Sequence, residues 1–289
     1  MGVVPKNIFF IFYKPFLQFY TLRYFLHIGY NGINYHGWQR QRDAVSVREV
    51  LEACISKILK TDVMCIGCGR TDSQVHASQY FLHMDVEKEW DFDLLFRLNK
   101  LLPRDIAVFD IIPMENSAHA RFDAVLRTYD YFIHTYKDPF LNERSAYYPE
   151  RNLKIDKMKE AAALMTKYND FRALCLTPDK QNSTICEVKS AQLYVDKNAD
   201  RLRFQISSNR FLRGMIRITI AKLLDIGTGV LSVDEFESYL ITKQTPKLIK
   251  PAFPQGLYLS KVTYPYLNIP PRTEFSVIFQ NGADKTITL

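Results

Sequence analysis

Hydrophobic positions in the first part of the chain predict a strand, a helix and two more strands. An apolar run at residues 21–28 predicts the first strand. Ser46 and Glu49 then form a capping box at the start of a helix. The apolar residues of this helix recur with the helical period, at Val47, Val50, Leu51, Cys54, Ile55 and Ile58. Strands are predicted at residues 63–66 and 79–86, with a loop of small and charged residues between them.

The same pattern continues to the end of a first half and then begins again. A helix at residues 92–101, which stops at Leu102-Pro103, and a strand at 106–112 complete the order β-α-β-β-α-β. This order is typical of a ferredoxin-like, split βαβ unit. The second half has a similar build, paired with the first by element order only. Its predicted elements are a strand at 127–135, a helix at 155–168, strands at 187–195 and 202–207, a helix at 210–226, a helix capped by Ser232 and Glu235, and a strand at 256–263.

Length and composition restrict the class of protein. A chain of 289 residues exceeds the usual size of a single core, so we expect one large or two medium domains. A content of 47% hydrophobic and 24% charged residues is ordinary for a soluble globular enzyme and excludes disordered and fibrous classes. The net charge of +7 favours a polyanionic partner, although a mildly basic enzyme of small molecules is equally compatible with it.

The five cysteines indicate a reducing compartment rather than a disulfide framework. Cys65 and Cys68 have the spacing of a zinc or redox pair. Zinc needs two further ligands, and the sequence offers no second Cys-x-x-Cys and no His-x-x-x-His pair. We therefore expect no metal here, and thiols packed in or beside a strand.

The first 20 residues have an unusual composition. Their apolar stretch at residues 8–13 is too short to span a membrane, and no other stretch is a plausible span. We expect residues 1–20 to be an extra flexible segment or the product of an upstream start codon, and we expect no association with a membrane.

The most informative segment lies between the second and third predicted strands. Residues 65–77 read Cys-Ile-Gly-Cys-Gly-Arg-Thr-Asp-Ser-Gln-Val-His-Ala, which places Asp72 close to Arg70 in a loop of small residues. Such a loop can bring backbone and charge close to a substrate. Gly-x-x-Asp segments are also common turns, in which the Asp accepts local backbone hydrogen bonds.

This segment resembles the catalytic loop of the TruA family of tRNA pseudouridine synthases, which usually reads Gly-Arg-Thr-Asp-Ala-Gly-Val-His. Further segments similar to this family follow in the family's order, and together they cover residues 22–266. They are residues 29–41, 102–107, 119–124, 127–131, 211–217 and 256–259. A chance match over so many ordered segments is implausible.

The resemblance implies a fold, a reaction and a partner. The two halves would share a continuous, mainly antiparallel sheet with helices on one side and a central basic cleft. The expected divisions are an N-terminal catalytic-loop domain at 21–115, a C-terminal domain at 116–268 and a tail at 269–289. The implied enzyme is a cytoplasmic, homodimeric isomerase that needs no cofactor. It converts uridine to pseudouridine in the anticodon arm of tRNA, at positions 38, 39 and 40.

The resemblance also implies the residues of the active site. Asp72 would be the catalytic carboxylate, ionised to act as nucleophile or base. Arg217 lies among apolar residues, where a guanidinium is rarely without a carboxylate, and the family pairs an arginine at this place with the catalytic aspartate. A structural acid is the alternative partner. Tyr129 would stack on the target base, although tyrosines that alternate along a strand are otherwise usually core residues. Arg70 suits the space that the flipped uridine leaves, or its displaced phosphate.

Other residues are candidates for RNA contact. If the helix starts at residue 210, three arginines share one of its faces and line the cleft. Near residue 38, aromatic residues alternate with cations, which suits RNA but also suits an ordinary loop anchored by a buried tryptophan. The two histidines among the candidates could equally be structural hydrogen-bonding residues. The candidates are Tyr35, Trp38, Arg40, His76, His119, Arg121, Arg210 and Arg213.

Three departures from the family pattern bear on substrate range more than on reaction type. Ser73 and Gln74 replace a small residue and a glycine, so loop shape changes if that glycine provides a left-handed turn. Ile218 and Ala221 stand where asparagine and glycine are usual. The altered loop leaves open a second hypothesis, a tRNA-binding protein that has kept the scaffold and lost catalysis. A third is an enzyme of small nucleotides.

Overall fold

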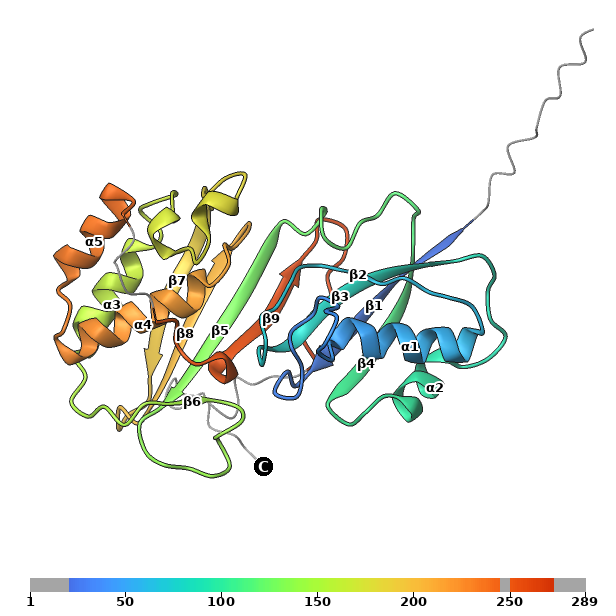
Figure 1. The fold of residues 1–289 in the computed structure, drawn as a ribbon, viewed down its shortest axis with the longest axis horizontal. Helices are drawn as coiled ribbons and strands as arrows, with labels where there is room; N and C mark the ends of the chain where they lie inside the picture. Colours follow the sequence, from blue (N-terminus) through green and yellow to red (C-terminus); the bar gives the residue numbers. More distant parts are fainter. Residues whose placement is uncertain (1–20, 245–249, 273–289) are drawn as a thin grey trace, which may run out of the picture.

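The computed structural model describes residues 21–244 and 250–272, and this part of the chain forms a mixed α/β fold around one sheet (Figure 1). The sheet has nine strands, and its main path runs in the order β4-β1-β3-β9-β5-β8-β7. The two-residue strands β2 and β6 pair with β3 and β5. The predicted continuous sheet is thus confirmed. It is mainly antiparallel, as predicted, and is mixed because β3 pairs with β9 and β5 with β6 in parallel.

The first half contains the elements that the sequence predicts. Its strands are β1 (Leu22–Tyr30), β2 (Ile66–Gly67), β3 (His76–Val86) and β4 (Ile106–Met114), and its helices are α1 (Val47–Leu59) and α2 (Leu94–Leu101). Strand β1 lies between β3 and β4 and is antiparallel to both. The Ser46 hydroxyl accepts a hydrogen bond from the Glu49 amide at 3.3 Å, which confirms the predicted helix start.

Strand β2 is shorter than the strand predicted at residues 63–66, and it begins three residues further along the chain, at Ile66. The amides of Val63 and Cys65 donate instead to side chains of α1, to Ser56 Oγ at 2.9 Å and to Glu52 Oε1 at 2.8 Å. These donors are therefore not available to a sheet ladder, and pairing with β3 is confined to Ile66 and Gly67.

The second half repeats the spatial order of the first. Strand β5 (Leu126–His134) lies between β8 (Arg201–Ser208) and β9 (Leu257–Thr263), and β7 (Val188–Val195) pairs with the far side of β8. Strand β6 (Ala146–Tyr147) was not predicted. The halves join where β3 and β9 run side by side, at His76 opposite Tyr258 and Ala77 opposite Leu259.

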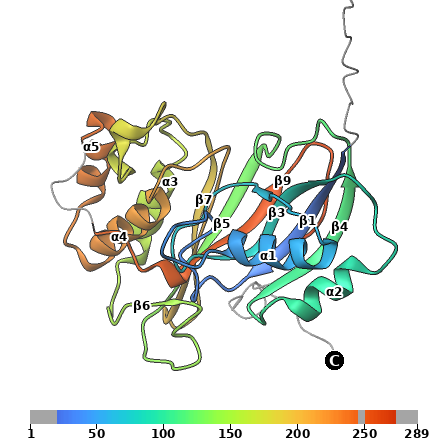
Figure 2. The same cartoon turned by 45° about the vertical axis from the view of Figure 1, so that its right-hand side comes forward.

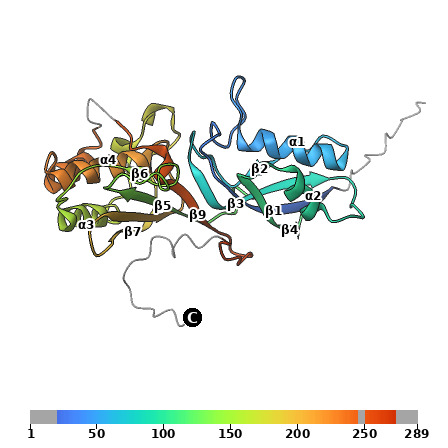
Figure 3. The ribbon, with the colours of Figure 1, turned by 90° about the horizontal axis from the view of Figure 1, so that it is seen from below.

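The helices of the second half are α3 (Ile155–Leu164), α4 (Met215–Thr228) and α5 (Val233–Thr242). The Ser232 cap is confirmed, with a 3.1 Å hydrogen bond from the Glu235 amide. Figures 2 and 3 show α1 and α4 on the same side of the sheet, α1 over the first half and α4 over the second.

The prediction of a helix from residue 210 is wrong. Gly214 has a left-handed backbone (φ +76°) and caps the N-terminus of α4, so Arg210 and Arg213 lie in the segment before the helix. A side chain at this conformation is strained. Only Arg217 lies on α4, and the predicted single helix face of three arginines does not exist.

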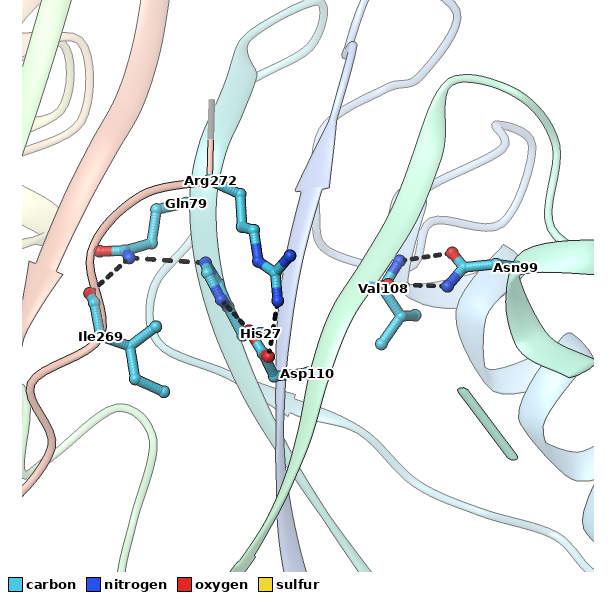
Figure 4. A network of polar contacts seen from close by, with 7 residues as sticks. All are labelled: His27, Gln79, Asn99, Val108, Asp110, Ile269 and Arg272. Carbon is cyan, nitrogen blue, oxygen red and sulfur yellow. Dashed lines mark hydrogen bonds and ion pairs between the residues drawn. The ribbon is translucent and has the colours of Figure 1, made fainter. Parts of the chain in front are cut away.

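Residues 264–272 follow β9 and cross the side of the sheet shown in Figure 4. The Gln79 side chain donates to the Ile269 carbonyl at 3.0 Å, and Arg272 pairs with Asp110 at 3.3 Å (Figure 4). Asp110 also lies 2.8 Å from Nδ1 of His27, whose side chain is fully buried. The first residues of the predicted tail thus contact β3 and β4.

The predicted division into domains stays a prediction, and the expectations for residues 1–20 lie outside the described residues. In the ranges that the structure covers, every helix is too short or too polar to cross a membrane.

Candidate active site

Asp72 and Arg217 are brought together from the two halves of the chain. Asp72 lies in the loop between β2 and β3, and Arg217 lies in the first turn of α4. Arg217 Nη1 is 3.8 Å from Asp72 Oδ2. The Asp72 side chain is 39% exposed and that of Arg217 only 18%. Arg217 is oriented separately, because its Nε donates to the Ala252 carbonyl at 2.6 Å. The pair leaves the carboxylate accessible to a substrate.

Among the residues that the structure describes, Asp72 is the only acid at ion-pair distance from Arg217. The alternative partner for this arginine, a purely structural acid, is therefore not found in the described ranges.

A neighbouring segment of the chain holds the shape of the Asp72 loop. The Trp38 amide donates to the Thr71 carbonyl at 3.3 Å, and the Gln74 amide donates to the Tyr35 carbonyl at 3.0 Å. Gly37 makes this approach possible: it has φ +83°, and a Cβ atom there would lie 2.3 Å from the Thr71 carbonyl oxygen. The loop and residues 35–38 are thus in direct backbone contact.

Gln74 takes the left-handed conformation that a glycine would adopt more easily. Its φ is +62°, and the turn closes with a 3.2 Å hydrogen bond from the Val75 amide to the Asp72 carbonyl. The left-handed turn is therefore present without the glycine, at the steric cost of a side chain in this region.

Tyr129 lies beside the Asp72 loop but is largely buried. Its side chain is 8% exposed, and its ring contacts Phe211 edge-on with centroids 5.1 Å apart. Burial raises the pKa of Tyr129, and the negative charge of Asp72 adds to this shift. Tyr131, two residues on, is fully buried and donates to the Phe253 carbonyl at 2.7 Å. Tyr129 thus has the burial of a core residue although it lies near Asp72, and its role in stacking on the target base stays a prediction.

Arg127 is a component of the site to which the sequence gave no role. It lies on β5 two residues before Tyr129, and all five of its N–H donors are used on backbone carbonyls. Nε and Nη2 donate to Cys68 at 3.1 and 2.7 Å. The remaining bonds, of 2.8 to 3.1 Å, go to Arg121, Ala124 and Asn209. Cys68 immediately precedes the loop of Asp72, so Arg127 fixes the start of that loop.

The predicted RNA-contacting residues around position 38 fall into two groups. Tyr35 and Trp38 are buried; the Tyr35 hydroxyl donates to Asp105 at 2.6 Å and the Trp38 ring packs on Tyr80 with centroids 4.3 Å apart. This is the position of an anchored loop, the alternative that the sequence left open. Arg40 is exposed and lies 3.8 Å from Glu49.

Arg70 is exposed, and no residue of 21–244 or 250–272 forms a hydrogen bond or ion pair with its side chain. Arg121 and Arg213 are also exposed, whereas Arg210 is half-buried. Roles of these arginines in RNA contact stay predictions.

His76 is a buried structural histidine in this conformation. Its Nδ1 accepts from the Gly32 amide at 3.0 Å, so that the proton is on Nε2, which donates to the Gln255 carbonyl at 3.1 Å. Burial lowers the pKa of His76 to about 4. Its ring also stacks on Tyr258 with centroids 4.5 Å apart. His76 therefore ties the Asp72 loop to the segment before β9.

Cys65 and Cys68 are buried thiols. Burial raises the pKa of both, that of Cys68 to about 11. Within the part of the chain that the structure describes, no group of three or more His, Cys, Asp or Glu residues could hold a metal ion.

Sequence comparisons point to a single family. A family model described as tRNA pseudouridine synthase matches residues 161–265. Three curated relatives are each called tRNA pseudouridine synthase A. That of Porphyromonas gingivalis is 37% identical over 84% of this chain and 97% of its own length. That of Bacteroides fragilis is 38% identical over 84% and 96%. That of Thermoanaerobacter sp. strain X514 is 36% identical over 82% and 97%.

Among solved structures, a 3-hydroxy-3-methylglutaryl-coenzyme A reductase from Streptococcus pneumoniae aligns with 77% of this chain and 59% of its own. The TM-score of 0.18 and the identity of 12% are too low to indicate a shared fold.

Proposed function

The chain belongs to the tRNA pseudouridine synthase family, and on this premise we propose that it isomerises uridine to pseudouridine in tRNA with Asp72 as the catalytic carboxylate. The observation that carries the proposal is the pairing of an accessible carboxylate with an arginine from the other half of the chain, 3.8 Å away. The family sequence pattern and the geometry thus select the same carboxylate.

The chemistry requires a carboxylate rather than a redox or group donor. The bond between C1′ of the ribose and N1 of uracil breaks, the base rotates, and C1′ bonds to C5. C5 loses a proton and N1 gains one, so the product is an isomer of the substrate. Asp72 acts as nucleophile or base in its ionised form. The Arg217 guanidinium lies 3.8 Å from this carboxylate, and its hydrogen bond to the Ala252 carbonyl keeps it in a fixed direction.

Arg70 and Tyr129 serve the target nucleotide in this proposal. A uridine within a stem leaves the base stack before it reacts, at a cost of a few kcal/mol. The exposed Arg70 guanidinium is free to occupy the vacated space or bind the displaced phosphate, because a planar cation both stacks and donates hydrogen bonds. Tyr129, near Asp72 and 8% exposed, is the residue to which we assign stacking on the flipped base.

The proposal also includes the detailed fold, the assembly, the cellular location and the target uridines that the family resemblance implies. We infer two ferredoxin-like halves, supported by the order β4-β1-β3 in the first half and β9-β5-β8-β7 in the second. We further infer a basic cleft above the junction of the halves, a homodimer, a cytoplasmic location and uridines 38, 39 and 40 of the anticodon arm as targets. The net charge of +7 supports a polyanionic substrate.

The test uses the isosteric variant Asp72→Asn on unmodified tRNA transcripts, with sites of modification mapped along the RNA. We expect pseudouridine at positions 38 to 40 with the wild-type protein and none with the variant. Asp62→Asn is the matched control, because Asp62 is exposed and lies before β2, away from the loop. Equal activity of wild type and Asp72→Asn would refute the catalytic assignment.

A second candidate function, a tRNA-binding protein without catalysis, is motivated by the side chain of Gln74 in the left-handed turn next to Asp72. It predicts that the wild-type protein binds tRNA with a steep dependence on salt and forms no pseudouridine in any tRNA. An enzyme of small nucleotides would show no such salt dependence.

A further inference from the structure

The loop between β4 and β5 presents an aromatic ring to solvent. The side chain of Phe122 is 75% exposed. One face of its ring is covered by His119, with ring centroids 4.2 Å apart and an angle of 29° between the planes. The guanidinium of Arg121 lies 5.8 Å from the ring centre. We call His119, Arg121 and Phe122 the Phe122 platform.

Hydrogen bonds hold this platform in place before any partner binds. His119 Nδ1 accepts from the amides of Arg121 and Phe122, both at 3.1 Å. The Asp123 carboxylate accepts from the His119 amide and from the Tyr266 hydroxyl, both at 2.7 Å. Burial lowers the pKa of His119, and the two amides that donate to Nδ1 place the proton of the neutral ring on Nε2. The ring is therefore exposed on an ordered loop, so little conformational entropy is lost when a partner covers it.

The platform is connected directly to the loop of Asp72. Nη2 of Arg127 donates to the carbonyl of Arg121 at 2.8 Å and to that of Cys68 at 2.7 Å. One side-chain nitrogen thus bridges the platform and the start of the catalytic loop. The backbone of the platform therefore lies next to the residue that leads into the Asp72 loop.

Phe140 provides a comparison within the same chain. It is even more exposed, at 87%, and it lies in the turn between β5 and β6. In contrast to Phe122, it has no ring partner and no cation over its ring among the described residues. Exposure alone therefore does not distinguish Phe122 from Phe140. Phe122 differs because His119 covers one face of its ring, hydrogen bonds hold its loop, and the Arg121 guanidinium lies near the ring.

We propose that the Phe122 platform stacks on a tRNA base other than the target uridine, with Arg121 on the adjoining phosphate. This proposal rests on the proposed function and adds a second point of contact beside the catalytic loop. A nucleobase fits the open face of Phe122 because any base has a π-face, and a cation next to an aromatic ring suits a nucleic acid backbone. The contact orients the RNA without taking part in the reaction.

The test measures the affinity of the full-length protein for an unmodified tRNA transcript at several salt concentrations. Loss of one stacked base corresponds to a fall in affinity of about 5- to 150-fold. We expect this fall for Phe122→Ala and for Phe122→Leu, which keeps an apolar side chain without a π-face. Phe122→Trp keeps an aromatic ring and is expected to bind with the affinity of the wild type. The slope of affinity against salt stays as in the wild type for the Phe122 variants and falls by about one unit for Arg121→Ala.

Phe140→Ala is the matched control and binds as the wild type. The proposal is overturned if Phe122→Ala binds tRNA as well as the control, or if Phe122→Leu binds as well as the wild type. It is also overturned if Phe122→Ala changes the mass of the protein in solution without RNA, because the ring then contacts a second protein chain. Failure of the proposed function is a different result, namely a wild-type protein that forms no pseudouridine.

Discussion

Substitution of Arg127 by lysine tests whether this residue only stabilises the fold or also holds the Asp72 loop in position. The first effect is measured as the free energy of unfolding and the second as kcat. The arginine uses five N–H donors on four carbonyls, whereas a lysine ammonium has three donors on one nitrogen. At least two hydrogen bonds are therefore lost. A bond to a charged group contributes about 1.5 kcal/mol or more, so the expected loss is about 3 kcal/mol in the free energy of unfolding.

The same substitution also releases the Cys68 carbonyl, which receives two of the five bonds. A displacement of the reacting groups by about 1 Å can lower a rate about 100-fold. We expect kcat of Arg127→Lys to fall about 10- to 100-fold with a smaller change in KM, measured as pseudouridine formation at a temperature where the variant is folded. Urea unfolding of the same preparation gives the change in stability.

Arg203→Lys is the control for this experiment. Arg203 lies on the neighbouring strand β8 and donates from Nε to Asp130 at 2.7 Å, and the buried Asp130 alternates with Tyr129 along β5, so this pair lies on the opposite side of the sheet. Its loss lowers stability without touching the Asp72 loop. The reasoning is refuted if Arg127→Lys loses stability but keeps the wild-type kcat, or if Arg203→Lys slows the reaction as much.

Three further predictions concern the Asp72 loop. Gly37→Ala places a Cβ atom 2.3 Å from the Thr71 carbonyl oxygen at φ +83°, so we expect a loss of more than about 1 kcal/mol in urea unfolding and a lower rate of pseudouridine formation. Gln74→Gly removes a left-handed side chain (about 1 to 2 kcal/mol) but adds backbone entropy (about 0.5 to 1 kcal/mol), so stability rises by about 0.5 to 1 kcal/mol; a decrease would contradict the strain. His76, with its pKa lowered from 6.5 to about 4, contributes stability that is fully present above pH 6.5 and lost as pH falls toward 4. Over this pH range the wild type should lose about 3 kcal/mol more in the free energy of unfolding than His76→Gln, because the other histidines with lowered pKa, such as His83, contribute to both proteins.

The order of the elements was predictable because its signals are local. The caps at Ser46 and Ser232 and the apolar periods need no knowledge of distant residues. The predicted starts of β2 and α4 were wrong because contacts with other parts of the chain and a left-handed glycine overrode the local apolar pattern. Side chains of α1 take the amides before β2. A left-handed Gly214 interrupts an apolar pattern that would otherwise extend α4 toward residue 210.

The sequence indicated Asp72 and Arg217, but it did not indicate Arg127, which holds the loop of Asp72 in place. Arg217 is recognisable because a guanidinium among apolar residues is rarely without a carboxylate, whereas Asp72 was selected by the resemblance of its loop to a family motif. The partners of Arg127 are backbone carbonyls, which every residue carries, so no residue type in the sequence indicates them. Burial of Tyr35 and Trp38 likewise depends on the fold, because alternation of aromatic residues and cations is the same in an anchored loop and in an RNA-binding loop.

Arg127 connects the two segments that supply Asp72 and Arg217. Cys68 leads into the loop of Asp72, and Asn209, another acceptor of Arg127, leads into the segment that ends at α4 and Arg217. Asp72 and Arg217 themselves are 3.8 Å apart and share no hydrogen bond, so their own attraction defines their geometry weakly. The separation of the pair therefore depends on hydrogen bonds made elsewhere. An arginine that binds only carbonyls fixes both segments without placing another acid near Asp72, the carboxylate to which we assign the reaction.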